Sequence, residues 1–536
     1  MRCFTVHCAF SFVFLPVILA LTPPIPYPPF DSVSDDVLAA LADPAQPATG
    51  IAYFEQYTDH SNPDFGVFNQ TYWYNATFWN GPGSPIILFT PGEVAATGYM
   101  SYLTDQTLAG LIAKEVGGAV VLVEHRYWGN STPFETQTTK NLRFLNLDQS
   151  VADFVHFAQT AKLPFDTEGT SNASDSPWIW TGGSYSGALG AWVESLAPGT
   201  FWATHSSSGP VEAIFDYWQY FYPIQQGMPK NCSEDYAAII DHVDKVLING
   251  SINETADLKE QFGLQDLAHL DDVAAAISSP IWAWQSIQFT SGYSQFYQMC
   301  DAIEDSAVLL NDSNPHGVGL EIALPNFAKW FKTEYLPGYC ASYGYDEWKD
   351  NDNTACFDTY NDSSPMFTDQ TQANSFGRTW VWMTCNEPFF YYQTGAPLNR
   401  STVFSRLASA DYWQRQCELF FPKEGDFTYG SGLGKTASDT NVHTKGWQLP
   451  EYLDAESRLL WVNGEFDPWR SASVASEFRP GGPLSSTPDV PSILIPGSRH
   501  CNDLRIQNAV NPDIKKTQAD IVSQIANWTN GFYMKR

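Results

Sequence analysis

A serine stands in a turn-like stretch, Gly182-Gly-Ser-Tyr-Ser-Gly187, between a short apolar run and a run with helical spacing. Small residues around it would let the backbone bend sharply, which is the pattern of a nucleophilic serine on a strand–turn–helix elbow. Ser184 is therefore the predicted nucleophile. The usual pattern has glycine at 186, where this chain has a serine that is small enough to fit. Ser186 is the rival nucleophile, but it would lie one step inside the helix.

A serine hydroxyl needs a base to take its proton and an acid to orient that base. Two loops near the end of the chain can supply them, and each follows a short apolar run. The first, Gly464-Glu-Phe-Asp-Pro-Trp469, contains Asp467, and the second, Gly497-Ser-Arg-His500, ends in a histidine. The order serine, acid, histidine is that of the α/β-hydrolases. The sequence thus predicts a triad of Ser184, Asp467 and His500.

Other residues compete for the two supporting roles. Glu465 is the first alternative for the acid and Asp503 a weaker one. His125 is the next candidate for the base, but it precedes the serine and breaks the chain order. An ordinary glycine-rich turn with a structural histidine is the alternative to the whole arrangement.

Acyl transfer also needs hydrogen-bond donors for the oxyanion. The N–H of Tyr185 is one candidate, and the loop Thr90-Pro-Gly-Glu93 should supply the second, from Gly92. The His-Gly-Gly-Gly sequence of many lipases is absent from this loop. Glu93, in the same loop, is a candidate substrate-binding residue. It could form a buried ion pair with Arg126 or Arg499, or it could be a solvated surface acid.

The elements around these residues alternate between strand-like and helix-like patterns. Short runs that are apolar on both faces are typical of buried parallel strands, and a strand–helix alternation predicts a doubly wound sheet. The predicted strands are 85–90, 118–124, 178–181, 458–463 and 492–496, and the predicted helices are 100–114, 147–161 and 517–528.

The middle of the chain differs in character, being helical in pattern and rich in Trp and Tyr. We therefore predict an α/β-hydrolase fold with a large, mainly helical cap insertion. The hydrolase domain would comprise residues 44–211 and 443–536, and the cap residues 212–442. Residues 1–21 read as a signal peptide, because Arg2 precedes a short apolar stretch.

Charge and sequons indicate an exported protein. The formal net charge is −31, and no basic run is present, which argues against nucleic acid and anionic membrane surfaces as partners. The acidic excess fits either simple solubility or adaptation to acid. We expect secretion, with a vacuole or lysosome as the alternative, and the oligomeric state is left open. Asn-x-Ser/Thr sequons occur at Asn69, Asn75, Asn130, Asn172, Asn231, Asn249, Asn253, Asn311, Asn361, Asn399 and Asn527.

Seven cysteines follow the predicted signal peptide, which allows three disulfides and one odd thiol in an oxidising compartment. The pairs Cys340–Cys356 and Cys385–Cys417 are favoured as short-range closures, although sequence alone does not fix the pairing. No Cys or His cluster has zinc spacing, so neither a metal nor another cofactor is expected.

Four motifs together resemble the proline-specific serine peptidases, a family of carboxypeptidases, dipeptidyl peptidases and fungal acid prolyl endopeptidases. They are Glu124-His-Arg-Tyr-Trp-Gly129, Gly182-Gly-Ser-Tyr185, Asn463-Gly-Glu-Phe-Asp-Pro-Trp469 and Gly497-Ser-Arg-His500. The resemblance implies a capped α/β-hydrolase that cleaves peptides on the carboxyl side of proline in the acid range. It also implies that Ser184, Asp467 and His500 are nucleophile, orienting acid and base.

A compact proline ring would be held by aromatic or Met side chains. Trp469 is the first candidate, and Trp382 and Met383 are weaker ones that could equally be plain core. For the carboxypeptidase members of this family, the resemblance implies a second histidine directly after the catalytic one. This chain has Cys501 at that position. We therefore expect a secreted endopeptidase that is closest to the fungal enzymes and works through an acyl-enzyme. A Pro-X carboxypeptidase or dipeptidyl peptidase is the alternative, an esterase or lipase a more distant one, and a non-catalytic binding module the last.

Overall fold

The computed structural model describes residues 48–304, 316–374, 377–387, 389–454 and 456–535. The predicted signal peptide lies outside these residues. A central eight-stranded sheet has the order β1-β2-β4-β3-β5-β6-β9-β10, with β1–β2 and β2–β4 antiparallel and the other neighbours parallel. This is the α/β-hydrolase fold that the sequence predicted. The strands are β1 (Thr49–Tyr57), β2 (Val67–Asn75), β3 (Ile86–Phe89), β4 (Ala119–Val123), β5 (Trp178–Gly183), β6 (Ala203–Ser207), β9 (Leu459–Gly464) and β10 (Ser492–Ile495).

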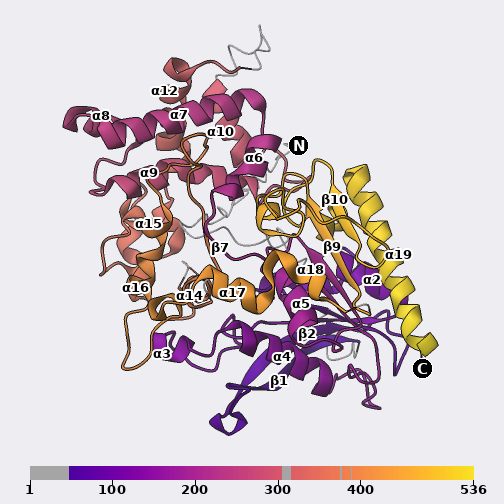
Figure 1. Cartoon of the computed structure of the whole chain (residues 1–536). Helices are drawn as coiled ribbons and strands as arrows, with labels where there is room; N and C mark the ends of the chain where they lie inside the picture. Colours follow the sequence, from indigo (N-terminus) through magenta and orange to yellow (C-terminus); the bar gives the residue numbers. More distant parts are fainter. Residues whose placement is uncertain (1–47, 305–315, 375–376, 388, 455, 536) are drawn as a thin grey trace, which may run out of the picture.

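Helices cover both faces of the sheet, and strands β3 and β4 are apolar throughout. Successive strand residues point to opposite faces. Ile86 and Leu88 belong to the larger core, which also contains residues of α4 (Leu147–Thr160) and α5 (Tyr185–Leu196). Ile87 and Phe89 belong to the second core, which contains residues of α2 (Leu108–Val116) and α19 (Pro512–Lys535). Figure 1 shows α19 and α2 together along one side of the molecule.

The prediction of one continuous helix over residues 100–114 is wrong in its middle. The structure has a 3₁₀ helix, η2 (Ala96–Leu103), then a turn, and then α2. Thr107 stabilises the turn, because its hydroxyl donates to the carbonyl of Tyr102 at 3.1 Å. Gly110 allows the turn to close on the helix, since a Cβ there would lie 2.0 Å from the Thr104 carbonyl oxygen. Local polar bonding of this kind competes with helix continuation.

A long, mainly helical insertion lies between β6 and β9. It also contains a small parallel sheet of β7 (Ile214–Asp216) and β8 (Phe390–Tyr392). In Figure 1 helices α7 to α12 gather at the end of the molecule away from β1. The exact domain boundaries stay a prediction. The helices are α6 (Phe221–Gly227), α7 (Lys230–Asn249), α8 (Ile252–Phe262), α9 (Leu270–Ser278), α10 (Gln295–Glu304), α12 (Leu320–Trp330), α13 (Pro365–Thr368), α14 (Arg378–Asn386), α15 (Ala410–Gln414), α16 (Gln416–Phe420), α17 (Ala437–Thr444) and α18 (Leu449–Tyr452), while α3 (Thr139–Leu142) precedes the insertion.

Three disulfides stabilise the insertion. The two predicted pairs, Cys340–Cys356 and Cys385–Cys417, are confirmed, and Cys232–Cys300 joins α7 to α10. The odd thiol is Cys501, which is buried beside His500. Within the described ranges no helix is long and apolar enough to cross a membrane.

Candidate active site

The elbow after β5 holds Ser184 in a strained backbone conformation, with φ 58° and ψ −132°. The Ser184 N–H donates to the carbonyl of Ser207 at the end of β6, at 2.9 Å, which fixes the turn against the sheet. Non-glycine residues in this region are costly and occur where the surroundings enforce them. The neighbours must be small: a Cβ on Gly182 would lie 2.3 Å from Ser186 Oγ, and one on Gly187 2.7 Å from the Ser207 carbonyl oxygen.

The rival serine is placed inside the protein. Ser186 belongs to the first turn of α5, is fully buried, and packs against Gly182. Its hydroxyl has no hydrogen-bond partner among the described residues. Ser184 occupies the turn itself, so it is the serine that the elbow presents.

Asp467 and His500 are brought together from two loops. Asp467 follows β9 and caps the short helix η11 (Pro468–Ala472), where its Oδ1 accepts from the Trp469 N–H at 3.0 Å. The same oxygen accepts from His500 Nδ1 at 2.9 Å, and both side chains are buried. Because Nδ1 carries the proton in this bond, Nε2 is free to accept one. His500 Nε2 is buried and has no hydrogen-bond partner in the described part of the chain.

The competing acids are engaged elsewhere. Glu465 accepts from the Gly497 N–H at 2.8 Å and so ties the acid loop to the histidine loop. Asp503 accepts from Ser207 Oγ at 2.5 Å and lies 3.2 Å from His205. Neither is the carboxylate that holds His500 Nδ1.

The competing base is buried and faces a tyrosine. His125 Nδ1 donates to the carbonyl of Arg126 at 2.9 Å, and its Nε2 accepts from the Tyr185 hydroxyl at 3.1 Å. Burial lowers the pKa of His125 to about 4. A histidine held neutral in this way positions the Tyr185 ring.

The predicted oxyanion loop lies against the elbow. Gly92 has φ 77°, and a Cβ there would lie 3.2 Å from Tyr185 Cδ1 and 3.4 Å from the Ser186 nitrogen. The Gly92 N–H donates to Thr90 Oγ1 at 3.3 Å, a long and weak bond. Glu124 holds the far end of the loop, because its Oε1 accepts from the Ala96 N–H at 3.0 Å. Gly92 and Tyr185 are therefore brought together.

The two arginines considered as partners of Glu93 are engaged by other residues. Arg126 is taken by Asp153, to which it makes two bonds of 2.6 Å. Arg499 lies over the Trp284 ring at 4.3 Å and donates to the Tyr297 hydroxyl at 2.6 Å. Glu93 Oε2 has no hydrogen-bond partner within the described ranges. Burial raises the pKa of Glu93 to about 8, so its carboxyl is neutral in acid.

Trp469, the first sequence candidate for a substrate contact, lies beside His500. Its ring centroid is 6.4 Å from that of His500, and its Nε1 donates to Gln285 Oε1 at 2.8 Å. Three tyrosines pack around the indole at centroid distances of 5.2 to 5.8 Å: Tyr217, Tyr220 and Tyr391. The histidine loop thus faces an aromatic wall built mainly from the insertion.

Trp382 and Met383 are buried in the main core of the protein. Trp382 is 1% exposed, donates to the Leu145 carbonyl at 2.8 Å and packs on Phe421. Met383 is fully buried in the main core. Residues two apart on a helix point in different directions, and it is Trp380 that contacts Tyr185, at a centroid distance of 5.5 Å. Within α14 it is therefore Trp380, and not Trp382, that packs against the elbow tyrosine.

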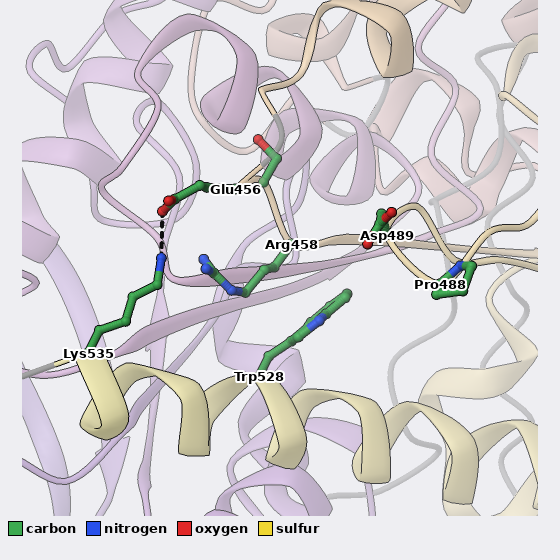
Figure 2. Close-up of a pocket in the computed structure, with 7 residues that line it drawn as sticks. Glu456, Arg458, Pro488, Asp489, Trp528 and Lys535 are labelled. Atoms are coloured by element: carbon green, nitrogen blue, oxygen red, sulfur yellow. Dashed lines mark hydrogen bonds and ion pairs between the residues drawn. The ribbon is translucent and has the colours of Figure 1, made fainter.

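A surface pocket of about 320 Å³ lies away from this site (Figure 2). It opens between the residues before β9 and the end of α19, whereas Asp467 follows the other end of β9. Glu456 and Lys535 form an ion pair of 2.6 Å across it. The pocket is lined by Glu456, Ser457, Arg458, Pro488, Asp489, Trp528 and Lys535.

Comparison with known proteins finds relatives that are named as serine proteases or carboxypeptidases. The family described as "Serine carboxypeptidase S28" matches residues 56–521. The serine protease vicPa of Bipolaris victoriae is 48% identical over 514 residues, which cover 95% of this chain and 94% of that protein. A probable extracellular serine carboxypeptidase of Arthroderma benhamiae is 33% identical, covering 86% of this chain and 64% of its own. The lysosomal Pro-X carboxypeptidase of Pongo abelii is 24% identical, covering 90% and 89%.

Proposed function

The chain belongs to the serine carboxypeptidase S28 family of serine-type peptidases, and from this premise we propose that it cleaves peptides on the carboxyl side of proline at acidic pH. Ser184 is the proposed nucleophile, His500 the base and Asp467 the acid that orients it. The observation that carries these roles is the 2.9 Å bond from His500 Nδ1 to Asp467, which leaves the buried Nε2 able to accept a proton.

The proposed reaction proceeds through an acyl-enzyme. Ser184 Oγ attacks the carbonyl carbon of proline while His500 Nε2 takes its proton. The carbonyl oxygen becomes an oxyanion that accepts from the N–H groups of Tyr185 and Gly92, the latter giving up its weak bond to Thr90. His500 then returns the proton to the leaving nitrogen as the C–N bond breaks. Water, deprotonated by the same nitrogen, hydrolyses the ester and frees Ser184.

Proline selectivity is proposed to come from the aromatic wall. Trp469 is the main contact for the proline ring, because it lies next to His500 and is held by several aromatic neighbours. Tyr391 and Trp380, which the sequence did not single out, extend the wall toward Tyr185. A rigid apolar wall favours a compact ring by dispersion and surface burial.

The preference for acid is supported by buried carboxyls. Burial raises the pKa of Glu93 to about 8 and those of Glu212 and Asp272 to about 7. Such groups stabilise the fold fully below their unfolded pKa of about 4, and this stability is lost as the pH rises through 7 to 8. His125 acts in the opposite direction, because its lowered pKa costs stability as the pH falls from about 6.5 to 4. His156 and carboxyls whose pKa is lowered, such as Asp153 and Asp166, act in the same direction as His125. The carboxyls with raised pKa values therefore predict a loss of stability only toward the alkaline end, as the pH rises toward 8.

Glu93 also lies next to the proposed oxyanion site. It follows Gly92 directly, and its charge adds to the effect of burial in raising the pKa of the Tyr185 phenol. Ionised Glu93 would oppose the developing oxyanion, whereas the neutral carboxyl would not. Activity is therefore expected to fall above about pH 8.

The variant Glu93→Gln tests this assignment. At pH 5 its stability should match that of the wild type, because a neutral carboxyl and an amide have nearly the same shape. At pH 9 the variant should be more stable by a few kcal/mol, since each pKa unit corresponds to about 1.4 kcal/mol. Urea unfolding at both pH values measures the difference. Glu115→Gln, at an exposed position, is the control and should show none. Equal pH dependence in Glu93→Gln and wild type would contradict the assignment.

Endopeptidase activity is the favoured mode of cleavage. Cys501, at the position where a carboxypeptidase would carry a second histidine, is buried, and burial raises the pKa of its thiol far above the usual value. Arg499, on the other side of His500, is engaged by Trp284 and Tyr297. The buried thiol therefore does not offer a cation for a substrate carboxylate, and the Arg499 side chain donates a hydrogen bond to Tyr297. Carboxypeptidase activity is the second candidate, because two of the relatives are named as carboxypeptidases.

Chromogenic substrates separate these modes. N-blocked Gly-Pro-p-nitroanilide, which has neither a free amine nor a free carboxylate, should be cleaved at pH 4–5. A blocked Pro-Phe with a free carboxylate and a Lys-Pro anilide with a free amine report the carboxypeptidase and dipeptidyl peptidase modes. Cleavage of only one of these last two would replace the endopeptidase proposal, and turnover of short acyl esters alone would favour an esterase.

Export is proposed from the same set of observations. The three disulfides suit an oxidising compartment. One relative is named extracellular and another lysosomal, so a vacuole or lysosome is the alternative destination. The sequon asparagines that are exposed in the structure are Asn69, Asn130, Asn249, Asn253, Asn361, Asn399 and Asn527.

A further inference from the structure

One short segment of the insertion, residues 284–289, contacts both loops that hold the proposed acid and base; we name it the clamp segment. On the acid loop, the Trp284 Nε1 donates to the Phe466 carbonyl at 2.8 Å. On the histidine loop, the carbonyl of Ile287 accepts from Asn502 Nδ2 at 3.2 Å. Gln288 Oε1 accepts from Asn508 Nδ2 at 2.7 Å.

Gln285 differs from the rest of the clamp segment because it faces the aromatic wall. Its Oε1 accepts from Trp469 Nε1 and from the Tyr220 hydroxyl, each at 2.8 Å. Gln285 is 1% exposed, and both donors are buried. A single carbonyl oxygen thus holds the Nε1 edge of the indole that lies next to His500, while the tyrosines pack on its faces and edges. Without it, two buried donors would lose their acceptor, and such groups drive a side chain to move until they are satisfied.

We propose that Gln285 is a specificity-determining positioning residue, which sets the angle of the Trp469 ring and thereby the preference for proline over smaller residues. This inference rests on the proposed function. Gln285 does not touch the reacting atoms, and it acts through Trp469. The insertion would then control specificity from behind the pocket wall, through a residue that the substrate never contacts.

A shift in selectivity follows from the difference between the two substrates. A proline ring gains contact area from a correctly angled indole, whereas an alanine methyl barely reaches it. Disturbing the indole should therefore penalise proline more than alanine. General damage to the clamp segment would move Asp467 and His500 and would slow both substrates alike.

The test compares kcat/KM for blocked Gly-Pro and Gly-Ala anilides at pH 5. Gln285→Met keeps the length of the side chain and removes the acceptor, and should lower the Pro/Ala ratio about tenfold or more. Gln285→Glu keeps an acceptor, because a buried carboxyl stays neutral in acid, and should hold the ratio within about threefold of wild type. The matched control is Gln288→Met, which removes a buried acceptor from the same segment without touching Trp469, and should leave the ratio unchanged.

Labelling Ser184 with a fluorophosphonate counts the active molecules, so that rates are compared per folded enzyme. An unchanged ratio in Gln285→Met, or an equal change in Gln288→Met, would overturn the inference. If Gln285→Met does not fold, Tyr220→Phe removes one of the two bonds to Gln285 and must lower the ratio by about twofold or more. Failure of the proposed function is seen separately, as wild-type enzyme that cleaves neither anilide or prefers Gly-Ala.

Discussion

Replacing Ser184 with alanine is expected to lower kcat on the blocked Gly-Pro anilide by a factor of about 10⁶, with KM almost unchanged. The substitution removes only the hydroxyl group. The strained elbow is set by the backbone hydrogen bond to Ser207 and by the glycines around it, and not by the Ser184 side chain. The variant should therefore fold as the wild type does. Steady-state kinetics and loss of fluorophosphonate labelling measure the effect.

Ser186→Ala is the matched control for this prediction. Ser186 lies two residues further along the chain, carries the same hydroxyl, and buries it without a partner in the described part of the chain. Removing a buried hydroxyl that makes no hydrogen bond costs little or improves stability. We expect activity within about threefold of wild type. Loss of labelling in Ser186→Ala with retention in Ser184→Ala would reverse the assignment of the nucleophile.

The elbow, the two loops and the strands before them could be predicted because each is a local pattern. A serine between small residues, and an aspartate or histidine directly after an apolar run, fix their own positions relative to the sheet. The parallel order of the strands then delivers the loops to one edge. The pairing of Asp467 with His500, over 33 positions in sequence, followed from that topology alone.

The substrate side could not be predicted in the same way. Trp382 was chosen over Trp380 within one helix, and only the packing of α14 against Tyr185 and Phe421 decides which ring faces the elbow. From the sequence, Glu93 could be either the partner of a buried arginine or a solvated acid, and only the structure shows that Arg126 is taken by Asp153. Gln285 carries no local signal at all. Such choices depend on contacts between segments far apart in sequence, which a single chain's pattern does not contain.

Asp467→Ala is expected to lower kcat by about 10⁴-fold, because it removes both the orientation of His500 and the charge that stabilises the imidazolium. Asp467→Asn separates these two effects in this protein. Asp467 Oδ1 accepts from both the Trp469 N–H and His500 Nδ1, while Oδ2 has no hydrogen-bond partner within the described ranges. An asparagine with its oxygen at the Oδ1 position would keep the histidine oriented. It would lose the charge and place its NH2 group at the buried Oδ2 position.

The kcat of Asp467→Asn should accordingly lie between that of wild type and that of Asp467→Ala. Glu465→Gln is the control, because Glu465 accepts from the Gly497 N–H and a glutamine oxygen can do the same. Its kcat should stay within about tenfold of wild type. A large loss of kcat in Glu465→Gln together with a small loss in Asp467→Ala would show that Glu465, and not Asp467, is the acid that orients His500. Equal losses in Asp467→Asn and Asp467→Ala would instead mean that the charge, and not the orientation, supplies almost all of what this carboxylate contributes.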